Sequence, residues 1–226
     1  MKKIVVGLAT IPERESTLPT VLASLHDQVD LIEVALNGYT KKPTFAKLYP
    51  KARFHLTTND KGDANKFLTV EKHRDAYYFS CDDDIKYPVS YIQTMIKYIE
   101  KHQCLVTCHG SDIPDRRLSS YYKNKVMRSH CLHTASEVSV DVAGSGVSGF
   151  DTSVLRLSYD RFELPNMADI FMSIQCVEQS VKRIAIKHRS GWIKGGMNKG
   201  RATIYETHRN NDRPQTKIVN EFDWRK

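Results

Sequence analysis

The feature that most constrains this chain is the alternation of short apolar runs with helical patterns across its first 110 residues. Apolar runs rich in β-branched and aromatic residues occupy residues 3–9, 31–36, 53–57, 76–81 and 104–108. Helical spacing of apolar residues begins at Leu18 and again after Pro88, and a further helix is predicted after Asp63. Strands that alternate with helices form a mostly parallel sheet with right-handed crossovers, so we expect an α/β fold.

A polar loop follows each of the first four predicted strands. These loops begin at Thr10, Asn37, Asp60 and Asp82. Ligands of parallel α/β sheets bind outside the carboxyl ends of the strands. The four loops are therefore expected to gather at one edge of the sheet and to line a common crevice.

Three consecutive carboxylates, Asp82-Asp83-Asp84, end the fourth apolar run. Adjacent carboxylates at the end of a hydrophobic strand repel one another and lose solvation, which costs free energy unless a cation or hydrogen-bond donors compensate. An Asp-x-Asp pair offers two oxygen ligands to Mg²⁺ or Mn²⁺, which keeps other positions for the oxygens of a diphosphate. A solvated acidic turn before a helix N-terminus is the alternative. From these residues alone both interpretations stay open.

The second half of the chain is less regular. Its patterns predict a strand at residues 137–142, a glycine turn at 144–149 and a helix at 169–181. Residues 111–134 are polar and basic, so we expect a loop that covers the crevice rather than a separate domain. The tail from residue 187 is rich in Lys, Arg, Gly and Asn, which is typical of a wrapping segment.

The ordered set of loop residues resembles the GT-A fold glycosyltransferases. The segments that carry the resemblance are Thr10-Ile11-Pro12-Glu13-Arg14, Asn37-Gly38-Tyr39, Gly62-Asp63-Ala64-Asn65-Lys66-Phe67 and Asp82-Asp83-Asp84. The chain is similar to inverting bacterial and viral sugar-nucleotide transferases over about residues 3–186. This resemblance implies a single GT-A domain over residues 1–226. Its parts are a Rossmann-like nucleotide-sugar-binding half (1–110), an acceptor and catalytic half (111–186) and a C-terminal wrapping segment (187–226).

The resemblance also implies an activity and its residues. The activity is metal-dependent transfer of a sugar from a nucleoside-diphosphate sugar, foremost a UDP-sugar, to an acceptor hydroxyl by inverting displacement. The donor-binding residues are Thr10, Pro12, Arg14, Asn37, Asp63, Lys66, Asp82 and Asp83. Among them, Asp63 is expected to contact the base or ribose, and Lys66 to neutralise phosphate. Charge that develops on the leaving diphosphate is stabilised by a metal together with Lys or Arg.

The metal ligands and the general base follow from the same resemblance. Asp82 and Asp84 are expected to hold Mn²⁺ or Mg²⁺, and a late histidine, either His188 or His208, completes the metal shell in some GT-A enzymes. Asp169 is the expected base that takes the acceptor proton, with Asp151 as its substitute. An acidic residue that only interacts with the helix dipole is the alternative for Asp169.

Two rival functions remain as alternatives. The run Gly144-Ser145-Gly146-Val147-Ser148-Gly149 matches the dinucleotide fingerprint of an NAD-binding oxidoreductase, but no long helix is predicted directly after it. A nucleic-acid-binding protein without transferase activity would explain the net charge of +8 and the basic segment around Tyr121 and Tyr122. The positive charge and the transferase activity are compatible if the acceptor is polyanionic. The acceptors considered are therefore a glycan, a lipid-linked glycan and modified phage DNA.

Cysteine usage and hydropathy bear on the compartment. The five cysteines are odd in number and scattered, which favours reduced thiols. Cys104, Cys108-His109 and Cys131-Leu132-His133 could be assembled into a zinc site, but residues 104–108 are also typical of a buried strand and the ligand spacing is loose, so we do not expect zinc. No apolar run is long enough for a membrane span or a signal peptide. We therefore expect a cytoplasmic protein, and the oligomeric state stays open.

Overall fold

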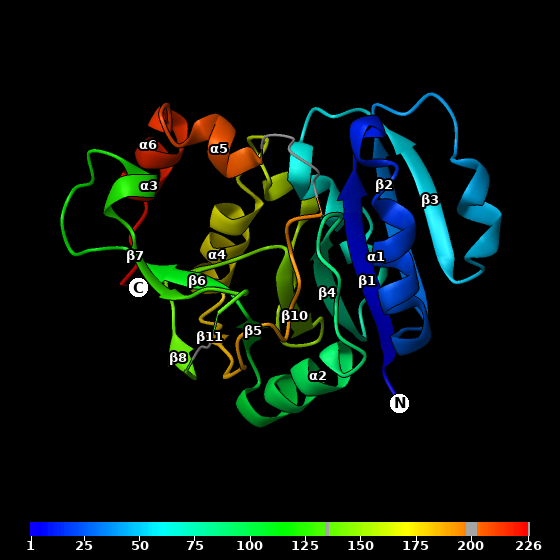
Figure 1. Ribbon diagram of the computed structural model, residues 1–226. Coiled ribbons are helices and arrows are strands. Elements are labelled where there is room, and N and C mark those ends of the chain that lie inside the picture. Colours follow the sequence, from blue (N-terminus) through cyan, green and yellow to red (C-terminus); the bar gives the residue numbers. More distant parts are fainter. Residues whose placement is uncertain (134–135, 198–202, 226) are drawn as a thin grey trace.

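The computed structural model describes residues 1–133, 136–197 and 203–225, which fold around an eight-stranded sheet (Figure 1). The strands follow the order β3-β2-β1-β4-β10-β5-β11-β8. Their bounds in that order are Ala52–Thr57, Leu31–Asn37, Lys3–Thr10, Ala76–Asp82, Val147–Asp151, Leu105–Thr107, Arg183–Ala185 and Val138–Ser139. The strands predicted in the first 110 residues are thus confirmed, with ends displaced by one residue or so.

The strands of the first half pair in parallel, as predicted. Strand β1 lies between β2 and β4, and β3 extends the sheet beyond β2. Every residue of β2 is buried, which explains why its sequence is an almost continuous apolar run. The helix α1 (Leu18–Leu25) and the helix α2 (Tyr91–His102) supply the crossovers, and each buries one apolar face.

Strand β10 breaks the parallel order. It runs antiparallel between β4 and β5, while β5 pairs in parallel with β11 and β8 pairs antiparallel with β11. The sheet is therefore mixed but mostly parallel. Because β10 runs in the opposite direction, its amino-terminal end lies at the same edge of the sheet as the carboxyl ends of β1, β2 and β4.

The second half adds a smaller sheet and four helices. The sheet has the order β7-β6-β9, with strands Val126–Ser129, Gly110–Asp112 and Val142–Ala143. The helices are α3 (Tyr121–Asn124), α4 (Ala168–Glu178), α5 (Ile204–His208) and α6 (Arg213–Glu221). Figure 1 shows α5 and α6 beside α3, above α4.

Two expectations for the second half were wrong. Residues 111–133 are not a plain loop, and residue 134 lies outside the described residues. Residues 111–133 carry part of β6 and all of α3 and β7, elements of three or four residues that are too short to show a periodic pattern. The strand expected at 137–142 is divided into β8 and β9. Between them the Asp141 carboxylate accepts a hydrogen bond from the Ile113 amide (2.8 Å) and forms an ion pair with Arg225.

Short 3-10 helices replace some regular helical turns. They comprise Pro12–Arg14, His26–Gln28, Thr44–Leu48, Gly62–Phe67, Val70–Lys72 and Tyr159–Arg161. The helix expected after Asp63 is one of these, and it packs against β1. Over the described ranges, we find no helix with the length and apolar character that crossing a bilayer requires.

Candidate functional site

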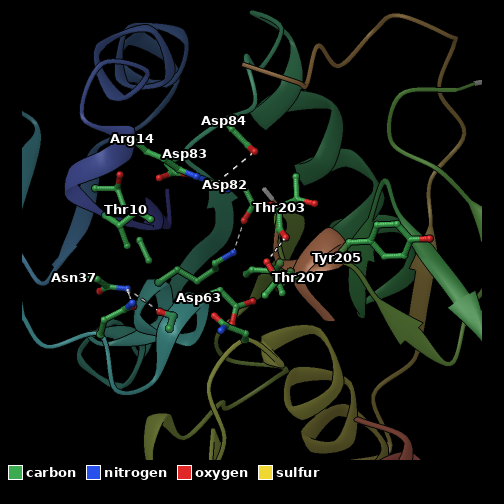
Figure 2. A pocket seen from close by; sticks show the side chains of 18 of the residues that line it. Thr10, Arg14, Asn37, Asp63, Asp82, Asp83, Asp84, Thr203, Tyr205 and Thr207 are labelled. Atoms are coloured by element: carbon green, nitrogen blue, oxygen red, sulfur yellow. Dashed lines mark hydrogen bonds and ion pairs between the residues drawn. The ribbon is translucent and has the colours of Figure 1, made fainter. Parts of the chain in front are cut away.

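A cleft of about 430 Å³ lies at the edge of the sheet where β1, β2 and β4 end (Figure 2). Thr10, Asn37 and Asp82 are the last residues of these three strands, so the sheet itself brings them together. The predicted residues that line the cleft are Thr10, Arg14, Asn37, Asp63, Lys66, Asp82, Asp83, Asp84 and His208. The crevice expected from the sequence is therefore confirmed.

The three consecutive aspartates face different partners. Asp82 keeps 40% of its side chain exposed and pairs with the buried ammonium group of Lys66. Asp83 is buried and forms an ion pair of 2.7 Å with the Arg14 guanidinium. Asp84 lies 3.4 Å from the same Arg14 nitrogen, so one cation serves two carboxylates.

The charge on the triad is incompletely balanced. Burial raises the pKa of Asp84 to about 6, and the neighbouring charge of Asp82 adds to this effect while Arg14 opposes it. Burial likewise raises the pKa of Asp83 against the influence of Arg14. Two carboxylates that repel each other and offer hard oxygen ligands suit a hard divalent cation. The side chains of Asp82 and Asp84 therefore fit Mg²⁺ or Mn²⁺.

The glycine run was expected to form a turn over residues 144–149, but residues 147–149 belong to β10, and Gly146 lies directly beside Asp82. A Cβ atom at Gly146 would lie 1.9 Å from Asp82 Oδ2, so only glycine leaves room for the carboxylate. The Tyr87 hydroxyl donates to the Gly146 carbonyl oxygen (2.5 Å) and accepts from the Asp82 amide (2.8 Å). Since the run leads into the antiparallel strand β10 and not into a helix, it lacks the helix N-terminus that the dinucleotide fingerprint requires.

Asn37 organises the loop that follows β3. Its amide nitrogen donates to the Gly62 carbonyl oxygen (2.8 Å), and its amide oxygen accepts from Asn65 (2.8 Å). Gly62 has a φ of 57°, in the left-handed region, and a Cβ there would lie 2.3 Å from the Asn166 amide oxygen. Asn37 thus shapes the site from within, and Gly62 lets the second-half segment at Asn166 approach the first half.

The carboxyl group of Asp63 is buried and is affected by the charges of both Asp82 and Asp169. Burial raises its pKa to about 7, the charges of Asp169 and Asp82 raise it further, and Lys66 opposes the increase. Its Oδ1 atom is buried without a hydrogen-bond partner in the described structure. An acceptor atom in this state is available to a donor group on a ligand.

Asp169 stands in the first turn of α4, at the beginning of the helix as the sequence suggested. Its carboxylate accepts a hydrogen bond from the Tyr121 hydroxyl (3.2 Å). The Lys125 ammonium lies over the rings of Tyr121 (4.5 Å) and Tyr122 (5.1 Å). Burial lowers the pKa of Lys125, and the Asp169 charge opposes this change. Sequence reasoning noticed the two tyrosines as a nucleic-acid signal but missed their place beside Asp169.

Four predicted residues are not among those that line the cleft, namely Asp169, described above, and three others. Asp151 ends β10 at the opposite edge of the sheet and forms an ion pair of 2.7 Å with Lys2, so it is not placed to substitute for Asp169. Pro12 is exposed and is not among the lining residues. His188 lies in a separate hollow beside Trp192, with its Nε2 atom 3.3 Å from the Cys108 carbonyl oxygen.

The tail supplies a further side of the cleft, of which the sequence analysis predicted only His208. Thr203, Tyr205, Thr207 and His208 line it from α5. Thr203 begins this helix with a capping box, in which its hydroxyl accepts from the Glu206 amide and the Glu206 carboxylate accepts from Thr203. The Thr-x-x-Glu spacing was the signal that could have located the helix.

Solved structures of TarS from S. aureus share this fold. TarS 1–349 in complex with UDP-GlcNAc matches with a TM-score of 0.59 over 90% of this chain and 62% of that chain, at 13% identity. TarS 1–349 in complex with UDP matches with a TM-score of 0.56 over 84% of this chain and 59% of that chain, at 16% identity. No family model matches the sequence, and no curated protein matches it.

This likeness establishes the fold. TarS has the GT-A fold, so the α/β GT-A fold expected from the sequence is confirmed. The chain spans about three fifths of the TarS 1–349 structure that holds UDP-GlcNAc, the matched share being 62%.

Proposed function

We propose that this protein is a metal-dependent glycosyltransferase that moves a sugar from a UDP-sugar to an acceptor hydroxyl with inversion. The observation that carries the proposal is the cleft at the carboxyl edge of the sheet, where Asp82 and Asp84 meet Lys66 and Arg14 in a GT-A fold. UDP and UDP-GlcNAc are the ligands named for the TarS complexes that share this fold.

The donor binds, in this proposal, across the ends of β1, β2 and β4. Thr10 and Arg14 line the nucleoside pocket, with Pro12 at its outer rim, and Asp63 accepts a hydrogen bond from the base or ribose. Asp82 and Asp84 would hold Mn²⁺ or Mg²⁺, and His208, which lines the same cleft, is the proposed third ligand. A cation held by these residues would stabilise negative charge on the leaving diphosphate. Lys66 adds a buried positive charge beside Asp82.

The acceptor binds on the side of α3 and α4. Asp169 takes the proton from the acceptor hydroxyl as the oxygen attacks the anomeric carbon, and the Tyr121 hydroxyl orients the carboxylate through its hydrogen bond. Lys125 places a positive charge next to Asp169. That charge, with the net charge of +8, supports a polyanionic acceptor such as a glycan, a lipid-linked glycan or modified DNA. Because an odd number of cysteines favours reduced thiols, we propose that the protein lies in the cytoplasm.

A thermal-shift panel tests the donor class. UDP, GDP, CDP, dTDP and NAD are each added with and without Mn²⁺, and a ligand at about 100 times its dissociation constant adds roughly 2.7 kcal/mol of stability. We expect UDP with Mn²⁺ to give the largest shift, and Asp84→Asn to abolish the metal-dependent part.

The control for this panel is Asp115→Asn, which removes an exposed carboxylate outside the cleft and should leave the shift unchanged. A shift with NAD alone would contradict the proposal in favour of an oxidoreductase. If no nucleotide shifts the transition but duplex DNA binds with strong salt dependence, the protein is a nucleic-acid-binding protein instead.

A further inference from the structure

A second group of metal-ligating side chains lies where the small sheet leaves the large one. His109 stands between β5 and β6, and His130 and Cys131 directly follow β7. One ligand atom from each of these three residues lies within 4.8 Å of the others. Twenty residues of chain separate His109 from His130, so the fold creates this cluster and the sequence spacing does not.

The distances suit a single ion of the zinc class. Zinc binds thiolate sulfur at about 2.3 Å and imidazole nitrogen at about 2.0 Å, which puts neighbouring ligands in a tetrahedron about 3.5 Å apart. The ligand atoms of the cluster, all within 4.8 Å of one another, lie near this spacing. The rings of His109 and His130 lie 5.1 Å apart at 68°, so they approach one point from different directions and do not stack.

The backbone holds the first ligand in place. The His109 carbonyl oxygen accepts hydrogen bonds from the Gly144 amide (2.7 Å) and the Thr107 hydroxyl (2.9 Å). A Cβ atom at Gly144 would lie 2.9 to 3.2 Å from the His109 side chain, so the glycine leaves the space that the imidazole occupies. A ligand residue that is already held in place loses less conformational entropy when the metal binds.

The protonation chemistry of the cluster is compatible with a metal. A neutral imidazole offers a nitrogen lone pair and a thiolate offers sulfur lone pairs, so the three side chains have the ligand types that zinc prefers. A metal binds cysteine as the thiolate, so binding at Cys131 displaces the thiol proton. The His130 Nδ1 atom accepts a 3.2 Å hydrogen bond from the Leu132 amide, and ligation through Nε2 would replace this bond as the proton moves to Nδ1.

The cluster differs from the site that sequence reasoning considered and set aside. Cys104 and Cys108 are buried in the core around β5, and neither belongs to the cluster. His130, which the sequence grouping omitted, takes a central position. The cluster is also chemically distinct from the carboxylates of the cleft, because imidazole and thiolate select a softer ion than Mg²⁺.

We propose that His109, His130 and Cys131 form a zinc site that fastens the segment 110–131 to the large sheet. Three protein ligands leave the fourth position for water or for His133, whose ring lies 4.9 Å from that of His130. The ion links the end of β5 to the end of β7 and so holds α3 between them. This site does not depend on the proposed transferase activity.

Cobalt titration of the full-length, chelator-treated protein tests the site. Co²⁺ is added in the presence of excess Mg²⁺, which occupies oxygen sites, and a thiolate-to-cobalt charge-transfer band reports a cysteine ligand. We expect one equivalent of Co²⁺ to produce the band, one equivalent of Zn²⁺ to remove it, and Zn²⁺ binding to release a proton. Zinc should also raise the melting temperature.

Variants decide whether this cluster is the ligand set. Cys131→Ser and His130→Ala should each abolish or strongly weaken the cobalt band, whereas Cys104→Ala, which removes a thiol outside the cluster, should retain it. Near-ultraviolet circular dichroism verifies that each variant is folded. Absence of the band in the wild-type protein, or its persistence in both cluster variants, would overturn the proposal.

Discussion

The two sides of the proposed active site are built in different ways. The donor wall is the cleft at the ends of β1, β2 and β4, and the proposed acceptor wall is the region around α3 and α4, beyond the residues that line the cleft. On the donor side, Thr10, Asn37 and Asp82 end three adjacent parallel strands, so the pairing register of the sheet fixes their positions. On the acceptor side, the elements are short and side-chain hydrogen bonds connect them. The Asp212 carboxylate, for example, accepts from the Ser120 hydroxyl (2.7 Å) and from the Tyr122 amide (2.8 Å). One wall is therefore set by the backbone, and the other depends on single polar residues.

The largest expected effect is a loss of the transfer rate that leaves nucleotide binding intact. Asp169→Asn removes the proposed base and should lower the rate of transfer by about 10²- to 10⁴-fold, the range that general base catalysis contributes. Because Asp169 lies on the acceptor wall, affinity for UDP with Mn²⁺ should stay within a factor of about two, measured by calorimetry. Asp160→Asn, at an exposed position, is the control. Turnover retained in Asp169→Asn would move the base to another residue.

The corresponding change on the donor wall should weaken nucleotide binding as well as the rate of transfer. Asp84→Asn removes one of the two proposed metal ligands, and we expect the rate to fall by about 10²- to 10³-fold with loss of metal-dependent nucleotide binding. The melting temperature without metal should rise or stay constant, since a partly buried carboxylate with a raised pKa is removed. Unchanged Mn²⁺ dependence would exclude Asp84 as a ligand.

The acceptor wall should be sensitive to the loss of one carboxylate. Asp212→Ala leaves the Tyr122 amide and the Ser120 hydroxyl without their partner and should destabilise the protein by about 1 to 3 kcal/mol. Unfolding in urea measures the loss of stability. A transfer assay should show a lower rate, and calorimetry should show that nucleotide affinity is kept. Glu221→Ala, an exposed position in the same helix α6, is the control. Equal losses of donor and acceptor function would show that the walls are not independent.

The last expected effect concerns the donor half alone and appears only at acid pH. Burial raises the pKa of Glu33, but hydrogen bonds with His73 and His55 lower it more strongly, to about 2. A folded-state pKa below the ordinary 4.5 contributes stability that is present above pH 4.5 and is lost as the pH falls toward 2.

Glu33→Gln should remove up to about 3 kcal/mol of that pH-dependent stability. Urea unfolding at several pH values measures the effect, with Glu163→Gln at an exposed position as control. A variant that loses stability between pH 4.5 and 2 as steeply as the wild type would contradict this assignment.

The same difference between the walls explains which features could be predicted from the sequence. Strands β1 to β4 have apolar runs that are long enough to be recognised, and the polar residues at their ends fell into one cleft as expected. The elements β6, α3 and β7 are too short for a periodic signal, so the neighbours of Asp169 were not found. The antiparallel direction of β10 was also missed, since hydrophobic pattern specifies the faces of a strand but not its direction.

The position of β10 has a consequence for how the chain reaches its folded state. Strand β4 pairs with β1 on one side, but its other side is covered only by β10, where Val147 lies opposite Cys81. During synthesis from the N-terminus, the backbone donors and acceptors on that side of β4 stay unpaired until residues 147–151 leave the ribosome. An unpaired edge of an apolar strand is a template for association between chains. A nascent or truncated chain that ends at residue 110 therefore exposes β4 as an unpaired edge strand that is prone to aggregation, although β4 is a central strand of the folded sheet.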